Sequence, residues 1–275
     1  MTLQIECEGA PRDLGLAQGR ACRIDLERSA ARRSIVEKLE DLLPGGSAGR
    51  RLRDVKRHYP HQSESMAGLS VGAGVSEIWL VRQMDADGEP APMAATIQEH
   101  ALLARGCQGD TLIRRSRPEG LFRSVELTHP WLTSSLIGVN ERGLGVAVSC
   151  EVGAAVEAPA ILLAQDCLER FENTEAAVEW CLNRPATGPS TVFLLDAAGE
   201  AAGVEILESE RRVLRPSEEV LVVGGRSDAA ELAKGLRDAR PSSVSALVLL
   251  VAAGNSAAID PSGPELFVAG ERFSP

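Results

Sequence analysis

The sequence has few aromatic residues and few lysines. Aromatic side chains make up 3% of its 275 residues, and Lys38, Lys56 and Lys234 are the only lysines. So small an aromatic content leaves little stacking surface for single-stranded nucleic acid. The formal net charge of −10 also disfavours nucleic acid and anionic membranes, because both prefer basic protein surfaces. We therefore expect neither nucleic acid nor a membrane as a partner.

Cysteine pairs with metal-binding spacing are also missing. The six cysteines are scattered, with no CxxC or CxxH pair. They are Cys7, Cys22, Cys107, Cys150, Cys167 and Cys181. This pattern argues against a zinc site and supplies no disulfide framework. We expect no metal site and no cofactor, and we interpret most of these cysteines as small core residues.

The sequence has no apolar run as long as a bilayer span, and its first residues, MTLQIECEGAPRD, lack a basic start and an apolar signal core. We therefore expect a cytoplasmic protein. Its apolar content of 44% is sufficient for a substantial core, and we expect residues 1–275 to form one domain. The oligomeric state stays open.

What the sequence does contain is a regular order of helix and strand patterns. Helical spacing predicts helices at residues 14–43, 48–59, 62–71, 161–171, 174–184, 228–238 and 242–252. Apolar runs between turn residues predict strands at residues 1–10, 111–115, 121–127, 132–139, 145–150, 191–196, 202–207, 212–214, 220–223, 257–260 and 265–269. This order predicts a layered α+β fold.

Residues 93–110 are the segment around which we expect the fold to be organised. Two apolar runs, 93–97 and 101–104, flank the polar residues 98–100, which is the pattern of a buried hairpin with a tight connection. The polar, turn-rich residues 85–90 lead directly into it.

Two other polar groups could form ligand sites. His58 and His61 have an HxxH spacing with Glu64 nearby, but Pro60 prevents the four residues from forming one turn inside a helix. A solvated helix boundary is therefore the favoured interpretation. The basic run at residues 114–117 is a weak candidate for an anionic ligand.

A series of glycine-containing motifs extends along the whole chain. They lie at residues 9–15 with 18–19, 65–68 with 71–75, 138–144, 193–199 with 204–205, and 260–270. Their order and spacing resemble those of the acyl-coenzyme A:6-aminopenicillanic acid acyltransferases and related N-terminal-nucleophile (Ntn) hydrolases. The resemblance implies a four-layer αββα sandwich, with two stacked, mainly antiparallel sheets between helical layers.

The resemblance also implies self-processing followed by amide hydrolysis or acyl transfer. In the family, residues like 1–92 form the propeptide or α-chain, and residues like 93–275 form the chain that begins with a cysteine. The thiol of that cysteine attacks the substrate, while its α-amino group, with a pKa of about 7.7–8.0, serves as the base.

The chain departs from the family at three catalytic positions. The family's cysteine falls within residues 89–95, which read EPAPMAA and contain no nucleophile. The family's Arg-Asn-x-Asp element aligns with residues 105–108, so Gly106 and Gln108 replace the asparagine and the carboxylate. Its Asn-His pair aligns with Gly224 and Gly225. We therefore expect an unprocessed pseudoenzyme that binds a small molecule or a biosynthetic partner protein in or around the old cleft.

An active enzyme is the alternative, with Cys107 and His129 as its candidate catalytic residues. Cys107 follows a glycine, and Gly-Cys is the type of bond that the family cuts. A nucleophile there would begin the second strand of the hairpin, however, and would leave little chain before Asn140 for the intervening strands. A buried or pocket-edge cysteine is the competing interpretation.

His129 is the candidate base for repurposed non-covalent chemistry such as a cyclisation, although a lone histidine beside an aromatic residue is more often structural. The residues that we expect around a ligand, in addition to these two, come from several parts of the chain. They are Met93, Ala94, Gln108, Trp131, Asn140 and Gly224.

Overall fold

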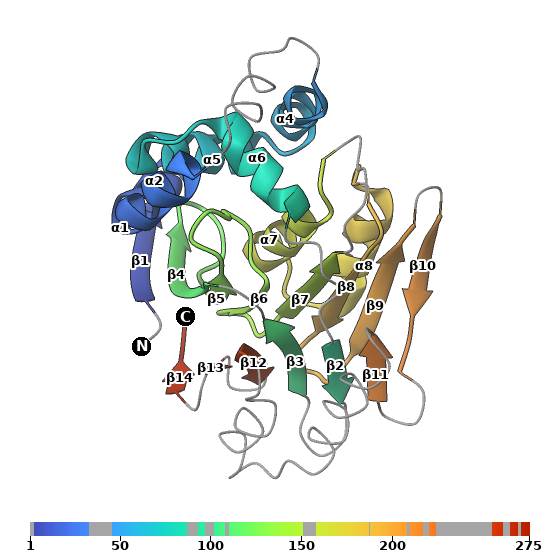
Figure 1. The fold of residues 1–275 in the computed structure, drawn as a ribbon. Coiled ribbons are helices and arrows are strands. Elements are labelled where there is room, and N and C mark those ends of the chain that lie inside the picture. The colour runs from blue at the N-terminus through green and yellow to red at the C-terminus, as the bar shows by residue number, and fades with distance from the viewer. Residues whose placement is uncertain are drawn as a thin grey trace.

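Two stacked β-sheets and a set of helices form the part of the chain that the computed structural model describes (Figure 1). That part comprises residues 3–32, 46–86, 93–96, 102–107, 110–150, 158–186, 188–207, 210–216, 220–223, 255–260, 265–268 and 271–275. The helices cover the outer face of the larger sheet, and the smaller sheet lies against its other face (Figure 1).

The N-terminal part of the chain is one strand followed by helices, as predicted except for the helix at residues 77–86, which the sequence patterns did not predict. The elements are β1 (Leu3–Gly9), α1 (Pro11–Ala21), α2 (Arg23–Ala31), α4 (Ser47–His58), α5 (Pro60–Ala73) and α6 (Glu77–Ala86). Pro11 and Pro60 stand at the first helical positions, where a missing N–H costs no hydrogen bond. The helix predicted from residue 14 is divided at Cys22 into α1 and α2, and its predicted end after residue 32 lies outside the described residues.

Helices α1 and α5 pack backbone against backbone. A Cβ atom on Gly15 of α1 would lie 1.7 Å from the carbonyl oxygen of Ser65, and one on Gly68 of α5 would lie 2.0 Å from that of Arg12. No side chain fits at such distances, because a Cβ and an oxygen cannot approach within 3 Å. This close crossing is a physical reason for glycine in two of the sequence motifs.

The larger sheet has eight strands in the order β1-β4-β5-β6-β7-β8-β9-β10. Its remaining strands are β4 (Leu112–Pro118), β5 (Ser124–Thr128), β6 (Ile137–Asn140), β7 (Gly145–Cys150), β8 (Ser190–Leu195), β9 (Ala201–Ile206) and β10 (Arg211–Leu214). β1 pairs with β4 in parallel, and the other neighbours are antiparallel. Two helices, α7 (Ile161–Arg170) and α8 (Thr174–Asn183), connect β7 to β8 and cover the same face as the N-terminal helices (Figure 1).

The smaller sheet has six strands in the order β11-β2-β3-β12-β13-β14. They are β2 (Met93–Thr96), β3 (Leu102–Cys107), β11 (Val220–Val223), β12 (Asn255–Asp260), β13 (Glu265–Val268) and β14 (Glu271–Phe273). β2 and β3 form the predicted antiparallel hairpin, with Met93 opposite Arg105. The hairpin therefore lies inside this sheet, flanked by β11 and β12.

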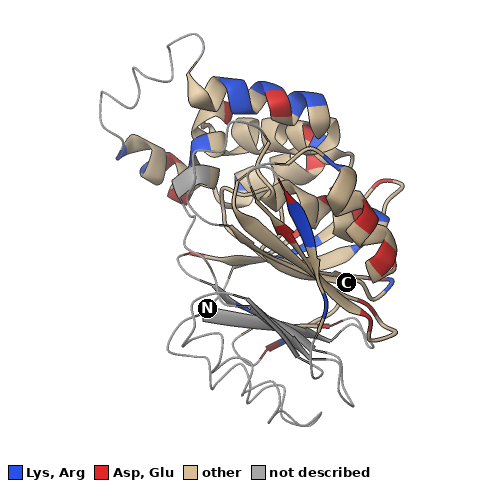
Figure 2. Ribbon diagram, turned by 90° about the vertical axis from the view of Figure 1, so that its right-hand side faces the viewer, with Lys and Arg blue, Asp and Glu red and all other residues tan. Residues whose placement is uncertain are grey.

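An apolar core lies on each side of the larger sheet. One cluster fills the space between the sheets, and the other lies between the larger sheet and the helices. Figure 2 shows the complementary pattern on the outside, where many charged residues lie along the helices. The helices predicted at residues 228–238 and 242–252 lie outside the described residues. Among the helices that are described, none combines the length and the apolar character needed to span a bilayer.

Candidate functional site

Three segments that the sequence analysis assigned to the site meet at one end of the smaller sheet. Met93, at the start of β2, pairs with Arg105 near the end of β3, and Val223, at the end of β11, pairs with Met93. Gly224 follows Val223 in the chain, but its own position lies outside the described residues. The strand register thus places the start of β2 beside the ends of β3 and β11.

Arg105 connects this end of the hairpin to the larger sheet. Its side chain is buried, and its Nε donates a hydrogen bond of 2.6 Å to the carbonyl oxygen of Val148 on β7. A guanidinium is always charged at neutral pH, so the site contains a buried positive charge between the sheets. Arg105 is the one residue that the resemblance retains from the family's Arg-Asn-x-Asp element.

Cys107 is the last residue of β3, where its backbone pairs with Asn255 of β12. Cleavage before Cys107 would cut this strand at its end, whereas the family's cysteine begins a strand. This position weighs against Cys107 as a processed N-terminal nucleophile. The side chains of Cys107, Met93 and Ala94, and all of Gln108, lie outside the described residues, so their proposed roles stay predictions.

His129 and Trp131 follow β5 and form a stacked pair, with ring centroids 5.2 Å apart and an interplanar angle of 14°. His129 Nδ1 lies 2.8 Å from the carbonyl oxygen of Asp110. Because a carbonyl oxygen only accepts, Nδ1 carries the proton, and Nε2 is the basic nitrogen of a neutral ring. Asp110 is three residues beyond Cys107, so the backbone positions of these two residues are at most about 11 Å apart.

Asn140 connects the turn between β6 and β7 to the end of α7. Its Nδ2 donates to the carbonyl oxygens of Leu168 and Phe171, each at 2.8 Å. Its Oδ1 accepts from the backbone N–H groups of Arg142 and Leu144, each at 3.0 Å. These bonds use both amide hydrogens and both lone pairs of the oxygen, so a ligand at Asn140 would have to displace one of them.

Three of the described thiols, those of Cys7, Cys22 and Cys150, have pKa values that disfavour nucleophilic chemistry. Burial raises the pKa of Cys7 and Cys150 to about 11 and that of Cys22 to about 12. The positive charge of Arg105 near Cys150 offsets only part of the effect. The thiolate is the nucleophile, so these residues are protonated and unreactive at neutral pH.

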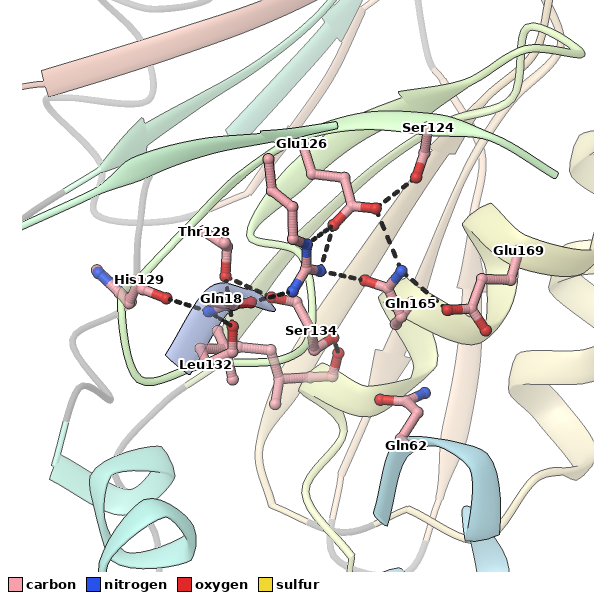
Figure 3. A network of polar contacts seen from close by, with 12 residues as sticks. Gln18, Gln62, Ser124, Glu126, Thr128, His129, Leu132, Ser134, Gln165 and Glu169 are labelled. Carbon is pink, nitrogen blue, oxygen red and sulfur yellow. Dashed lines mark hydrogen bonds and ion pairs between the residues drawn. The ribbon is translucent and has the colours of Figure 1, made fainter. Parts of the chain in front are cut away.

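A buried polar network, which the sequence analysis did not predict, lies between the larger sheet and the helices (Figure 3). At its centre Arg114 of β4 is paired with Glu126 of β5, and the side chain of Arg114 is 5% exposed. Its guanidinium also donates to Gln18 of α1 at 2.7 Å and to Gln165 of α7 at 3.0 Å. One charged residue therefore connects two strands and two helices.

The neighbours of this pair complete its hydrogen bonding. Gln18 Nε2 donates to the carbonyl oxygens of His129, Pro130 and Leu132, and so holds the loop that carries His129 (Figure 3). Burial alone would lower the pKa of Arg114, but nearby groups that favour the charged form, above all the Glu126 carboxylate, together outweigh this effect, and the net shift is upward. Arg114 is thus a paired structural cation, and the hypothesis of an anion-binding run at residues 114–117 is wrong for this residue.

Glu169 lies at the far end of the network, where its Oε1 accepts a hydrogen bond of 3.1 Å from Gln165. Burial raises the pKa of Glu169 to about 7, and the nearby His61 counteracts part of this rise. The sequence signal for the whole network was weak. A charge such as Arg114 or Glu126 inside an apolar strand is unusual, but the sequence does not show which residue of opposite charge will lie beside it.

Comparison with known proteins gives structural neighbours at low identity. No protein-family model and no curated protein matches the chain. Penicillin V acylase from Agrobacterium tumefaciens is 15% identical, with a TM-score of 0.44 over 65% of this chain and 82% of that chain. An N-acylethanolamine-hydrolyzing acid amidase ortholog from Caenorhabditis elegans is 14% identical, with a TM-score of 0.48 over 62% of this chain and 92% of that one.

A mutant of conjugated bile acid hydrolase from Clostridium perfringens is a further neighbour, 10% identical, with a TM-score of 0.46 over 65% of this chain and 88% of that one. By their names, the three neighbours are an acylase, an amidase and a hydrolase. Similarity at this level does not transfer an activity to this chain.

Proposed function

We propose that this chain is an unprocessed Ntn-hydrolase-fold homologue of the acyl-CoA:6-aminopenicillanic acid acyltransferases, and that it binds a small molecule at the end of the β2–β3 hairpin without hydrolysing it. The proposal includes the four-layer αββα sandwich that the resemblance implies. Two stacked sheets with helices on the larger one support the fold.

One observation carries the proposal. The register of β2, β3 and β11 brings together the three segments that would supply the family's nucleophile, its Asn-Asp element and its Asn-His pair. In this chain the same segments contain EPAPMAA before and within β2, Gly106 and Gln108 in place of the polar pair, and Gly224 with Gly225 after β11. Acyl transfer by this fold needs a nucleophile and oxyanion donors, and the residues that would supply them are missing at the aligned positions of these segments.

The first test is the intact mass of the purified protein. A single chain of 29.2 kDa is expected, because residues 89–95, where the family's nucleophile would lie, contain no nucleophilic side chain. Incubation with penicillin V, which gives one structural neighbour its name, should release no acid. Two fragments separated near residue 93 or residue 107, or steady release of acid, would refute the proposal.

Selective alkylation tests the alternative in which Cys107 is an active nucleophile. Cys7, Cys22 and Cys150 serve as slow internal references, because their raised pKa values leave little thiolate at about pH 7.5. Under the proposal, iodoacetamide labels Cys107 no faster than an ordinary exposed thiol of pKa about 8.5. Rapid labelling of Cys107 that persists when the pH is lowered to about 6 would indicate an activated thiolate. A Cys107→Ala variant identifies the labelled peptide.

A second candidate function, acid–base catalysis by His129, has one observation in its favour. The bond to Asp110 makes Nε2 the basic nitrogen, which a general base requires. Small molecules extracted from the purified protein can be incubated with fresh protein and followed by mass spectrometry. Because a cyclisation can conserve mass, the chromatographic retention time is recorded as well. An unchanged mass and retention time support binding alone, whereas a change of either that is lost in His129→Gln supports catalysis.

A further inference from the structure

One histidine and two carboxylates meet between α5 and α7, on the helical side of the larger sheet. His61 Nε2 lies 2.8 Å from Asp166 Oδ1 and 3.4 Å from Glu169 Oε2. One ligand atom from each of the three residues lies within 4.8 Å of the others. Asp166 and Glu169 are three residues apart on α7, so they share one face of the helix. The cluster therefore joins two helices that are far apart in the sequence.

Neighbouring side chains hold both carboxylates in place. Asp166 accepts hydrogen bonds from Gln62 at Oδ1 (2.9 Å) and from Trp180 at Oδ2 (3.1 Å). Glu169 accepts at Oε1 from Gln165, as described above. Partners of this kind orient metal-binding carboxylates and keep them from turning toward solvent.

Glu169 Oε2 is the second observation that points to a ligand. This oxygen is buried and has no hydrogen-bond partner, and the Glu169 side chain is 7% exposed. A buried acceptor without a partner is unfavourable, because nothing compensates for its loss of hydration. The oxygen faces the ring of His61, so a cation between the two would satisfy it together with His61 Nε2.

From this geometry we propose that His61, Asp166 and Glu169 bind a divalent transition-metal ion, with Zn²⁺ as the best match. Ligands at about 2.1 Å from a tetrahedral zinc are about 3.4 Å from each other, which is within the range of the present spacings. An imidazole ligand favours zinc over Ca²⁺ or Mg²⁺, which prefer oxygen ligands. The His61 side chain is 16% exposed, whereas its Nε2 and Glu169 Oε2 are buried, so an ion and a water ligand would enter by a shift of this partly exposed side chain.

Two arginines next to the cluster affect the expected affinity. Arg184 Nε lies 3.9 Å from Asp166 Oδ2, the oxygen that does not face His61, and its guanidinium lies over the rings of Tyr59 and Trp180. Arg170 Nη2 lies 3.5 Å from His61 Nδ1. Zinc at Nε2 leaves a proton on Nδ1, so Arg170, which is exposed, must turn away. Removing the Arg170 charge should therefore tighten binding.

The proposed site does not use the HxxH pair, because His58 is not among its three ligands. His58 ends α4 and Pro60 begins α5, as expected for a helix boundary, and the ligands that His61 faces come from α7 instead. His58 is therefore a matched control for His61 at the same junction. Glu172, an exposed residue just beyond α7, is the matched control for Glu169.

The test uses full-length protein freed of metal with EDTA and then desalted. Titration with ZnCl₂ by calorimetry, and with CoCl₂ by visible absorption, should give one site per chain. His61→Ala and Glu169→Gln should weaken binding by about tenfold or more, because each removes a ligand. His58→Ala and Glu172→Gln should leave the dissociation constant unchanged, and Arg170→Gln should lower it.

The result that overturns the proposal is equally specific. Absence of zinc binding below millimolar concentration, or equal binding by all of these variants, excludes the site. A strong thiolate-to-cobalt charge-transfer band would place the ion on cysteine instead. If His61→Ala does not fold by circular dichroism, Glu169→Gln decides the outcome, because it keeps the size of the side chain and removes its charge.

Discussion

The two faces of the larger sheet bury different chemistry in the same strands. Toward the smaller sheet, Ile113 of β4 and Val125 and Leu127 of β5 belong to an apolar cluster. Toward the helices, the alternate positions Arg114 and Glu126 form a buried ion pair. Successive residues of a strand point to opposite faces of the sheet, so adjacent residues of the same strand lie in these two different environments.

The comparison shows that burial imposes different demands on the two faces. An apolar core tolerates exchanges that keep volume, because dispersion and solvent exclusion have little directionality. A buried ion pair needs each partner, because removing one leaves an uncompensated charge in a poorly solvated place. The helical face therefore should be the more sensitive to single conservative substitutions.

The largest effect is expected for Glu126→Gln on the helical face. The variant keeps the size of the side chain but leaves Arg114 buried without its counter-charge, so the free energy of unfolding should fall by about 3–5 kcal/mol. Urea unfolding followed by circular dichroism measures this change. Glu119→Gln, at an exposed position, should change it by less than about 0.5 kcal/mol.

If Glu126→Gln lowered the free energy of unfolding by less than about 1 kcal/mol, this would contradict a charged pair at the centre of the network. The double variant Arg114→Met with Glu126→Leu sharpens the same test. Removing both charges should give a more stable protein than Glu126→Gln alone, because no unpaired charge remains.

Leu127→Ala probes the apolar face one residue away. Leu127 is fully buried, and deleting its methyl groups should cost about 2–5 kcal/mol through lost transfer energy and a residual cavity. Leu127→Met nearly conserves volume and should cost less than about 1.5 kcal/mol. If Leu127→Met were as damaging as Glu126→Gln under the same urea conditions, the proposed contrast between the faces would fail.

The smallest effect concerns two threonines near His129. Thr128 Oγ1 bonds to the carbonyl oxygens of Leu132 (3.1 Å) and Ser134 (2.6 Å), so Thr128→Val should lower stability by about 1 kcal/mol. Thr133 Oγ1 is buried without a hydrogen-bond partner, so Thr133→Val should be neutral or stabilising. Thermal unfolding of both variants measures the two changes in stability. Equal losses of stability would contradict the predicted difference between Thr128 and Thr133.

Much of the element order could be predicted from local patterns. The predicted helix at residues 161–171 corresponds to α7 (Ile161–Arg170), and the predicted hairpin corresponds to β2 and β3. Both depend on apolar periodicity and on nearby turn residues, which are properties of short segments. The division of the first helix at Cys22 was missed because its apolar spacing continues across that residue.

In the candidate site, only the pairing of β2 with β3 could be predicted from the sequence. The pairing of Met93 with Arg105 joins strands that are close in the sequence, but the pairing of Met93 with Val223 joins segments more than a hundred residues apart. The roles of Cys107, Gln108 and Gly224 remain predictions. The bonds that hold Asn140 and His129 depend on α7, on Asp110 and on Gln18, whose proximity no local pattern shows.

The sequence alone determined that residues 89–95 contain no nucleophile, because this is a matter of residue identity, and it determined most helices and strands through their periodicity. Only the tertiary structure decided that Arg114 faces Glu126 and that His61 faces Asp166 and Glu169. Such contacts depend on how α5, α7 and the sheet pack, and packing is a collective result of burying apolar surface across the whole chain.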